Sequence, residues 1–125
     1  YKGWKILLRV CYDLRFPVWS RNIHDYDLLI YVANWPSPRI NAWDNLLVSR
    51  AIENMCYCVG VNRLGKDKNN NYYPGHSLAI DLFGKKICDL KDEPGIHSFI
   101  LDKEFIQLKR NDLPFLDDKD NFILK

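Results

Sequence analysis

The chain has 125 residues, of which 47% are hydrophobic, and it includes four Trp, seven Tyr and six Phe. This supply of core material excludes an intrinsically disordered chain and fits one compact domain or part of a larger one. Eighteen basic and 16 acidic residues give a net charge of +2 without a basic run, so we expect no nucleic-acid partner.

The ends of the chain suggest a fragment. The first residue is Tyr1 and the only methionine is Met55, so we expect that the natural start lies upstream. No apolar stretch reaches the roughly 18 residues needed to cross a bilayer, and we expect no membrane partner.

The first part of the chain alternates apolar runs with turns. Residues 5–10 predict a buried strand, and Pro17 suits the first turn of a short helix. The near-continuous apolar run at 27–33 predicts a strand covered on both faces. Residues 34–38 (NWPSP) predict a loop, because each proline disfavours helix for the residue before it.

A helix and two more strand patterns follow. Apolar residues recur at helical spacing from Ile40 to Asn54, which predicts a helix of about four turns. Residues 56–61 predict a strand, and residues 65–71 (GKDKNNN) a polar loop. Residues 77–90 predict a hairpin around Phe83-Gly84.

The last third of the chain predicts one more strand, a helix and a tail. Residues 96–101 have the composition of a strand, and Asp102 can cap a helix over 103–111. Residues 112–125 predict a tail that lies on a neighbouring surface. Helices between apolar strands indicate an α/β layer. A sheet with helices on one side only leaves its other face to a missing N-terminal half or to a second subunit.

The four cysteines indicate neither a disulfide scaffold nor a zinc site. Cys56 and Cys58 alternate in one strand and so point to the same side, and no CxxC pair is present. We therefore expect no metal and interpret Cys56, Cys58 and Cys88 as small buried hydrophobic residues. Cys11 differs because a strand ends there and a helix begins, where backbone N–H groups favour a thiolate. Position alone still leaves an inert cysteine as the commoner case.

A wider pattern surrounds Cys11. Residues 11–17 (CYDLRFP) follow a strand that begins after Gly3-Trp4, and residues 31–36 (YVANWP) and 50–54 (RAIEN) come later. With Asn62-Arg63 and the segment 75–84, these motifs resemble the nitrilase superfamily of carbon–nitrogen hydrolases over nearly the whole chain. Residues 18–22 (VWSRN) and 31–36 (YVANWP) are similar to its bacterial ω-amidase branch.

The resemblance implies a fold and a function. The fold is α/β, half of a four-layer α-β-β-α sandwich, in which residues 1–125 are the C-terminal part of one domain with its tail at 112–125. The expected activity is thiol-dependent hydrolysis of a small amide without a cofactor, by a cytoplasmic homo-oligomer. The family uses a Glu as base and a Lys for the oxyanion. Both precede the Cys by more than the ten residues present here, so we expect this chain alone to be inactive.

The same resemblance implies roles for individual residues. Cys11 is the expected nucleophile, and the backbone N–H of Tyr12 the expected oxyanion donor. We expect Asp13 and Arg15 to pair and to support this turn. Apart from the resemblance, Asn34 and Trp35 follow the strand at 27–33 and lie at the same sheet end as Cys11 if the strands are parallel, so they are candidates to line the substrate pocket. For Trp35, a packed loop aromatic is about as plausible.

Three further charged residues are candidates for a role in the site or in its support. Arg39 is a candidate clamp for a substrate carboxylate, although a surface cation at a helix start is as plausible. We interpret Arg50 and Glu53 as a structural salt bridge, and do not assign Glu53 as the missing base.

Other functions remain open from the sequence. A carbamoylase or nitrilase of the same superfamily is one alternative, and an inactive fragment that acts only in assembly is another. A papain-like thiol hydrolase would require a histidine beside the thiol, for which His24 is nearest in sequence.

Overall fold

The computed structural model describes residues 1–120, 122 and 123. These residues form seven strands, two 3-10 turns and three helices. In chain order the elements are β1 (Ile6–Val10), a 3-10 turn (Cys11–Arg15), α1 (Pro17–Ser20), β2 (Leu28–Ala33), a 3-10 turn (Ser37–Arg39), α2 (Ile40–Glu53), β3 (Tyr57–Asn62), β4 (Leu64–Lys66), β5 (Tyr72–Pro74), β6 (Leu78–Ile80), β7 (Lys86–Asp89) and α3 (Lys103–Asp112).

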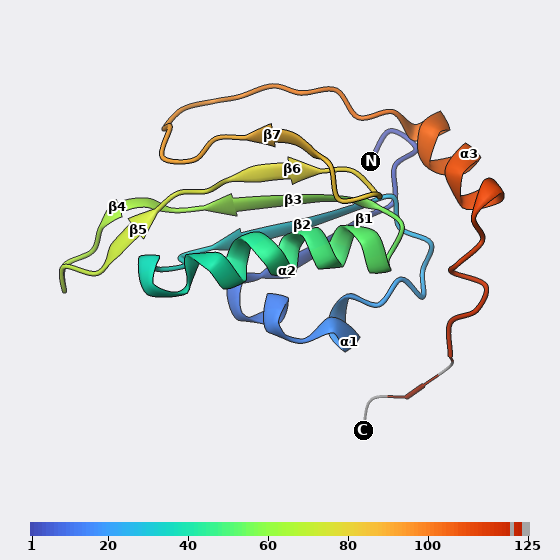
Figure 1. The fold of residues 1–125 in the computed structure, drawn as a ribbon, viewed down its shortest axis with the longest axis horizontal. Coiled ribbons are helices and arrows are strands. Elements are labelled where there is room, and N and C mark those ends of the chain that lie inside the picture. Colours follow the sequence, from blue (N-terminus) through green and yellow to red (C-terminus); the bar gives the residue numbers. More distant parts are fainter. Residues whose placement is uncertain (121, 124–125) are drawn as a thin grey trace.

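The main sheet has the strand order β1-β2-β3-β6-β7 (Figure 1). β1, β2 and β3 are parallel, whereas β3, β6 and β7 pair antiparallel. The predicted α/β layer is confirmed, because α2 connects β2 to β3 across one face of this sheet. β4 and β5 form a separate two-stranded ribbon beyond the end of β3.

Helix α2 covers one face of the sheet because its apolar residues follow the helical repeat. Trp43, Leu47 and Ala51 are fully buried against the sheet. β3 has Gly60 beneath them, and a Cβ there would lie 2.4 Å from a Leu47 methyl carbon. The glycine therefore lets the helix lie close to the strand.

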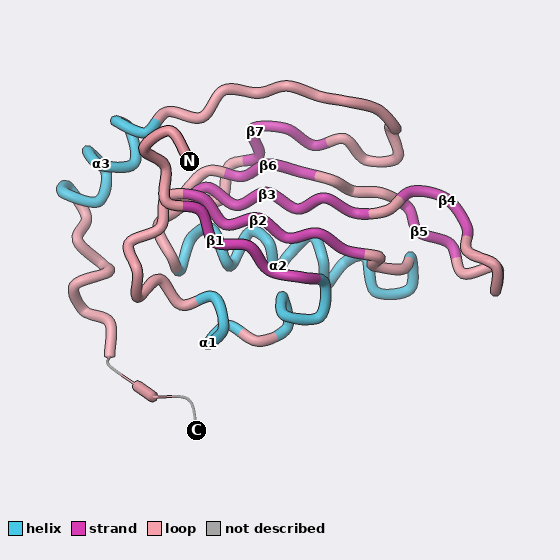
Figure 2. Tube along the Cα trace, turned by 180° about the vertical axis from the view of Figure 1, so that it is seen from behind, coloured by secondary structure: helices cyan, strands magenta, loops and turns pink. Residues whose placement is uncertain are grey.

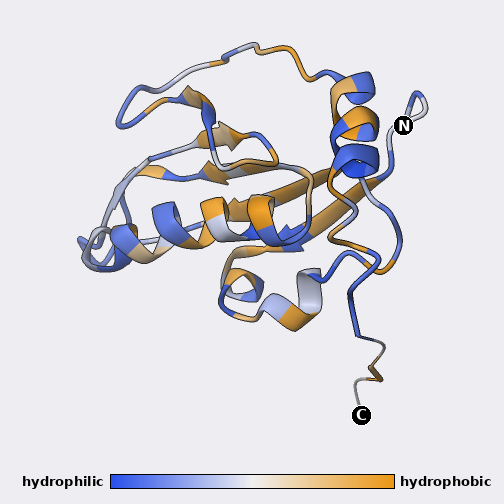
Figure 3. Ribbon diagram, turned by 45° about the vertical axis from the view of Figure 1, so that its right-hand side comes forward, coloured by the Kyte–Doolittle hydropathy of each residue, from blue (hydrophilic) through white to orange (hydrophobic). Residues whose placement is uncertain are grey.

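The opposite face of the sheet is apolar and bears no helix (Figure 2). Leu8 and Val10 are 66% and 60% exposed, and Val32 and Val61 beside them are also exposed. Apolar colouring follows these central strands (Figure 3). The expectation that one face would lack a cover within this chain is confirmed. The predictions of a buried strand at 5–10 and of a strand at 27–33 covered on both faces are therefore wrong for this chain, because one face of β1 and β2 is open.

Helix α3 docks at the end of the sheet where β1 and β2 begin, beside the N-terminus (Figure 1). Asp102 caps it by accepting a hydrogen bond from the Phe105 backbone N–H at 3.1 Å, as predicted. Buried Asp27 forms ion pairs with Lys103 at 3.2 Å and Arg110 at 3.7 Å. These contacts fix α3 to the start of β2.

Two predicted elements are wrong. Residues 96–101 form no strand: Ile96 and Ile100 are 99% and 90% exposed, and the segment runs beside β7 without forming a ladder with it (Figure 1). The polar run 65–71 was expected as a loop, but its first residues lie in β4, which pairs with β5. β5 was not predicted, whereas the other strands and the helices occur where the sequence predicted them, within about two residues at each end.

The described part of the tail contacts its own chain. Leu116 is buried with α3 in a second apolar cluster, and the Lys119 ammonium donates a hydrogen bond to the Asn22 carbonyl at 3.1 Å. The prediction of a tail over 112–125 includes residues 121, 124 and 125, which lie outside the described residues. Among the helices described, none is long and apolar enough to span a bilayer.

Candidate functional site

The candidate site lies where the three parallel strands end. Val10, Val32 and Val61 are neighbours in the ladder, so the residues that follow them emerge at the same edge of the sheet. Cys11 follows β1, and Trp35 follows β2 after one intervening residue. Ligands of α/β proteins commonly bind at such an edge.

Cys11 occupies a constrained turn. Its backbone φ is 42°, in the left-handed region that a residue with a Cβ rarely adopts. The Asp13 carboxylate accepts a hydrogen bond from the Val10 N–H at 2.9 Å. On the inner side, the buried Arg50 guanidinium donates to the Leu14 carbonyl at 2.6 Å. The turn is therefore fixed from both sides, which holds the thiol in one place.

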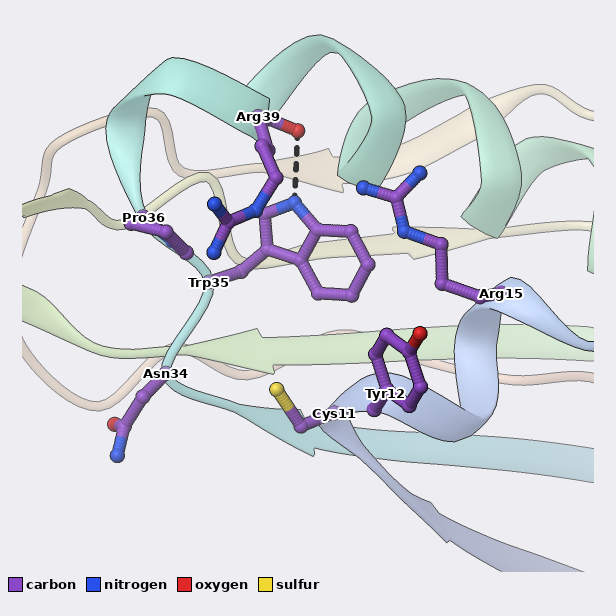
Figure 4. Close-up of a pocket in the computed structure, with 7 residues that line it drawn as sticks. All are labelled: Cys11, Tyr12, Arg15, Asn34, Trp35, Pro36 and Arg39. Carbon is purple, nitrogen blue, oxygen red and sulfur yellow. Dashed lines mark hydrogen bonds between the residues drawn. The ribbon is translucent and has the colours of Figure 1, made fainter.

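A cavity of about 420 Å³ opens beside this thiol. Its lining residues come from the Cys11 turn and from the loop after β2: Cys11, Tyr12, Arg15, Asn34, Trp35, Pro36 and Arg39. Figure 4 shows the thiol and the Trp35 indole facing the same hollow, with the Arg15 and Arg39 side chains on opposite sides of the indole.

Trp35 organises the wall of this cavity. Its side chain is buried, and its indole N–H donates to the Arg39 carbonyl at 2.7 Å (Figure 4). The Arg15 guanidinium carbon lies 4.9 Å from the centroid of the indole ring, a cation–π arrangement. Trp43 of α2 packs behind it, with ring centroids 5.6 Å apart.

The five residues predicted for the reaction or the pocket come together, since Cys11, Tyr12, Asn34, Trp35 and Arg39 all line the cavity. Asp13 and Arg15 were predicted only to support the turn; Asp13 bonds within it, whereas Arg15 lines the cavity. The expected pairing of Asp13 with Arg15 is wrong. Side chains two residues apart diverge in this turn, so Asp13 bonds the Val10 N–H while Arg15 lies on Trp35.

The other cysteines differ from Cys11 in their surroundings. Cys56 and Cys58 are fully buried, as predicted, but Cys88 is only half-buried, so the prediction of its burial is wrong. Burial raises the pKa of the Cys56 thiol to about 12 and the pKa of the Cys58 thiol well above its ordinary value. Neither thiol therefore ionises near neutral pH, and both behave as hydrophobic side chains.

Neither His24 nor His76 lines the cavity beside Cys11. His24 is exposed in the segment after α1. The His76 imidazole pairs with the Asp44 carboxylate at 2.9 Å, so its bonding is satisfied away from the thiol. The predicted salt bridge between Arg50 and Glu53 is also confirmed, at 3.0 Å.

Sequence reasoning missed two supporting residues. It interpreted Arg50 only as the partner of Glu53, although Arg50 also holds the Cys11 turn through Leu14. It gave no role to Asn62, the last residue of β3, whose side chain hydrogen-bonds the backbone of Trp35. The strand-end argument that selected Cys11 and Trp35 applies equally to the third parallel strand, and it would have selected Asn62.

Sequence comparisons connect this site to known hydrolases. The family profile described as Carbon-nitrogen hydrolase matches residues 1–110. The chain is 47% identical to the Omega-amidase YafV of Yersinia enterocolitica, over 99% of this chain and 49% of that protein. It is 37% identical to the 2-oxoglutaramate amidase of Bacillus subtilis, over 87% of this chain and 42% of that protein. The chain thus spans about half the length of these relatives.

Solved structures share the fold. XC1258 from Xanthomonas campestris, a CN-hydrolase superfamily protein with an arsenic adduct in its active site, superposes with a TM-score of 0.97 at 40% identity, over 100% of this chain and 50% of that one. A mutant amidase from Nesterenkonia sp. AN1 superposes with a TM-score of 0.69 at 26% identity, over 76% of this chain and 36% of that one. That amidase carries the acetamide moiety of fluoroacetamide covalently added at its active-site cysteine.

Proposed function

The chain belongs to the carbon–nitrogen hydrolase family, and on that premise we propose that it carries the nucleophile of an amidase for small amides that bear a carboxylate. One observation carries the proposal: the Cys11 thiol shares its cavity with the guanidinium groups of Arg15 and Arg39. In the described part of the chain, neither guanidinium forms an ion pair. Both are therefore available to an anionic ligand.

The chemistry follows from a thiol nucleophile. The Cys11 thiolate attacks the amide carbonyl, and the Tyr12 backbone N–H donates to the oxyanion that forms. Collapse of this intermediate breaks the C–N bond, and ammonia leaves with the proton taken from the thiol. Water then opens the thioester, which releases the acid and restores the thiol. The family resemblance places the Glu that moves these protons, and the Lys that stabilises the oxyanion, outside this chain.

The two arginines argue for the substrate class. A guanidinium binds a carboxylate through paired N–H groups. Stacking on the indole orients the Arg15 guanidinium, and the hydrogen bond from the indole to the Arg39 carbonyl holds the backbone from which the Arg39 side chain extends. A substrate such as 2-oxoglutaramate has an amide at one end and a carboxylate at the other, which suits a cavity with a thiol and two cations. Two relatives are named for activity of this kind.

Kinetics of the complete enzyme test the proposal. Hydrolysis of 2-oxoglutaramate should exceed that of N-carbamoyl amino acids and of nitriles. Arg15→Gln and Arg39→Gln should each raise KM for 2-oxoglutaramate roughly tenfold to a hundredfold, the worth of a charge-assisted hydrogen bond. A neutral amide without a carboxylate is the control, since its KM should change little. Equal losses on both amides would contradict the carboxylate assignment.

The enzyme that carries this chain is further proposed to be a cytoplasmic homo-oligomer. Phe16, Val18 and Trp19 are exposed together around α1, and such apolar groups commonly mark an interface between subunits. The cytoplasm is reducing, and it keeps a nucleophilic thiol in the free state that catalysis needs.

A further inference from the structure

Asn62 ends β3, at the edge of the sheet that holds the candidate site. The residue is only 7% exposed, and its side-chain amide makes three hydrogen bonds to main-chain groups. The Oδ1 atom accepts from the Trp35 N–H at 2.7 Å, and the Nδ2 group donates to the Trp35 carbonyl at 3.0 Å. The second Nδ2 hydrogen goes to the Gly75 carbonyl at 2.7 Å. One amide therefore binds both the backbone N–H and the carbonyl of Trp35 and connects this residue to the turn after β5.

Everything that Trp35 orients depends on this attachment. Its indole N–H sets the Arg39 carbonyl, and its ring face carries the Arg15 guanidinium. Neither arginine touches Asn62 in the hydrogen bonds of the described residues, so any influence passes through the tryptophan.

We propose that Asn62 is a positioning residue that fixes Trp35 and thereby sets the two guanidinium groups for the substrate carboxylate. This inference rests on the proposed function. Only an amide can accept from one backbone N–H while it donates to two carbonyls. A carboxylate at this position would face both carbonyls without a hydrogen to donate, and a methyl group would leave all three backbone groups without their partner.

The nucleophile is held by other contacts. Asp13 bonds the Val10 N–H, and Arg50 bonds the Leu14 carbonyl, and neither bond includes Trp35 or Asn62. Loss of the Asn62 amide therefore disturbs the binding of the carboxylate more than the attack by the thiolate. The kinetic consequence is a rise in KM with a nearly unchanged kcat.

The test uses Asn62→Asp and Asn62→Ala in the complete enzyme. We expect KM for 2-oxoglutaramate to rise about tenfold, with kcat within about threefold of wild type. Asn62→Asp loses the hydrogen bonds to the Trp35 and Gly75 carbonyls, and Asn62→Ala also loses the bond from the Trp35 N–H. Kinetics with a neutral amide should remain as in wild type. The near-ultraviolet circular dichroism of the Trp35–Trp43 pair should change as well, because the rings lose their fixed arrangement.

Asn22 offers a matched control. Its fully buried amide has the same pattern: Oδ1 accepts from the Tyr26 N–H at 2.9 Å, and Nδ2 donates at 3.0 Å to the carbonyls of Tyr26 and Asn54. These contacts lie near the end of α2, whereas Trp35 precedes its start, about 20 Å away along a helix of this length. Asn22→Asp should lower the melting temperature as Asn62→Asp does, without a change in KM or in the tryptophan signal.

Three outcomes would overturn the inference. The first is an equal effect of Asn62→Asp on both amides. The second is a tryptophan signal that stays as in wild type. The third is that neither Asn62 variant folds while Asn22→Asp does, which would give the amide a role in folding alone. If wild type itself shows no preference for the carboxylate-bearing amide, the proposed function fails instead, and the tryptophan signal still reports whether Asn62 holds Trp35.

Discussion

Cys11 combines a nucleophilic side chain with a backbone conformation that side chains disfavour. At a φ of 42°, a Cβ costs about 1 kcal/mol relative to glycine. We predict that Cys11→Ala and Cys11→Gly both abolish turnover in the complete enzyme while the fold persists. The Gly variant should have a free energy of unfolding about 1 kcal/mol higher than the Ala variant. Paired denaturation curves measure this difference, and equal stabilities would show that the turn is unstrained.

Thiol labelling distinguishes Cys11 from the buried cysteines. A thiol is alkylated as its thiolate, which forms as the pH rises toward the pKa. Burial holds the pKa of Cys56 at about 12 and raises that of Cys58, so neither should react at neutral pH in the folded enzyme. With the half-buried Cys88 replaced by Ser, mass spectrometry should find one equivalent of iodoacetamide, on Cys11. Denaturant should expose Cys56 and Cys58 to the reagent, and labelling of either before unfolding would contradict their burial.

The sequence predicts those parts of the site that directly follow the ends of parallel strands. Parallel strands that end together place Cys11 and Trp35 at one edge of the sheet. This inference needs only the apolar pattern of the strands and the helix that connects them. The partners of Asp13 and Arg15 could not be predicted, because opposite charges two residues apart predict a pair unless the turn is known to separate them. The role of Asn62 depends on hydrogen bonds to a loop 27 residues earlier in the chain, for which the sequence has no local pattern.

At the scale of elements, apolar periodicity predicted α2 and the strands that pack against it. It failed where hydrogen-bond pairing with a neighbouring strand decides whether a segment becomes a strand. Residues 96–101 have the composition of a strand, but a strand exists only when its backbone groups find a partner. Here the segment follows β7 without a ladder. β4 shows the reverse case, since a polar run forms a strand because the turn at Asp67 brings it to β5.

Contact between α2 and β3 leads to a prediction at Gly60. A Cβ there would meet Leu47 at 2.4 Å and the Trp43 ring at 2.6 Å. Gly60→Ala should therefore force the helix outward and lower the free energy of unfolding by about 2 kcal/mol. Leu47→Ala removes one of the two obstacles, so the double variant should be less destabilised than the sum of the single variants. Chemical denaturation of the four proteins measures this coupling, and simple additivity would show that the helix accommodates the methyl group without contact.

The whole molecule has one covered and one uncovered sheet face. α2 buries the face that contains Leu29 and Tyr31, and the opposite face presents Leu8 and Val10. The relatives are about twice as long as this chain, and the family resemblance implies a second sheet layer from the other half. The uncovered apolar face is the surface that such a layer would bury.

This arrangement predicts that Leu8→Lys has opposite effects in the two contexts. In the isolated chain, Leu8 faces water, and a lysine there should reduce self-association and raise the monomer fraction measured by sedimentation. In the complete enzyme, the same lysine would be buried between two sheets without a partner charge. The melting temperature should then fall, by the equivalent of about 3 kcal/mol.

Leu108→Lys is the matched control, because Leu108 is also an exposed leucine, 56% against 66% for Leu8, but lies on α3. It should change neither the association of the isolated chain nor the melting temperature of the complete enzyme by a comparable amount. If Leu8→Lys is tolerated in the complete enzyme as well as Leu108→Lys is, the face around Leu8 stays in water there. A second layer would then have to pack elsewhere, because a lysine that remains hydrated carries no burial cost.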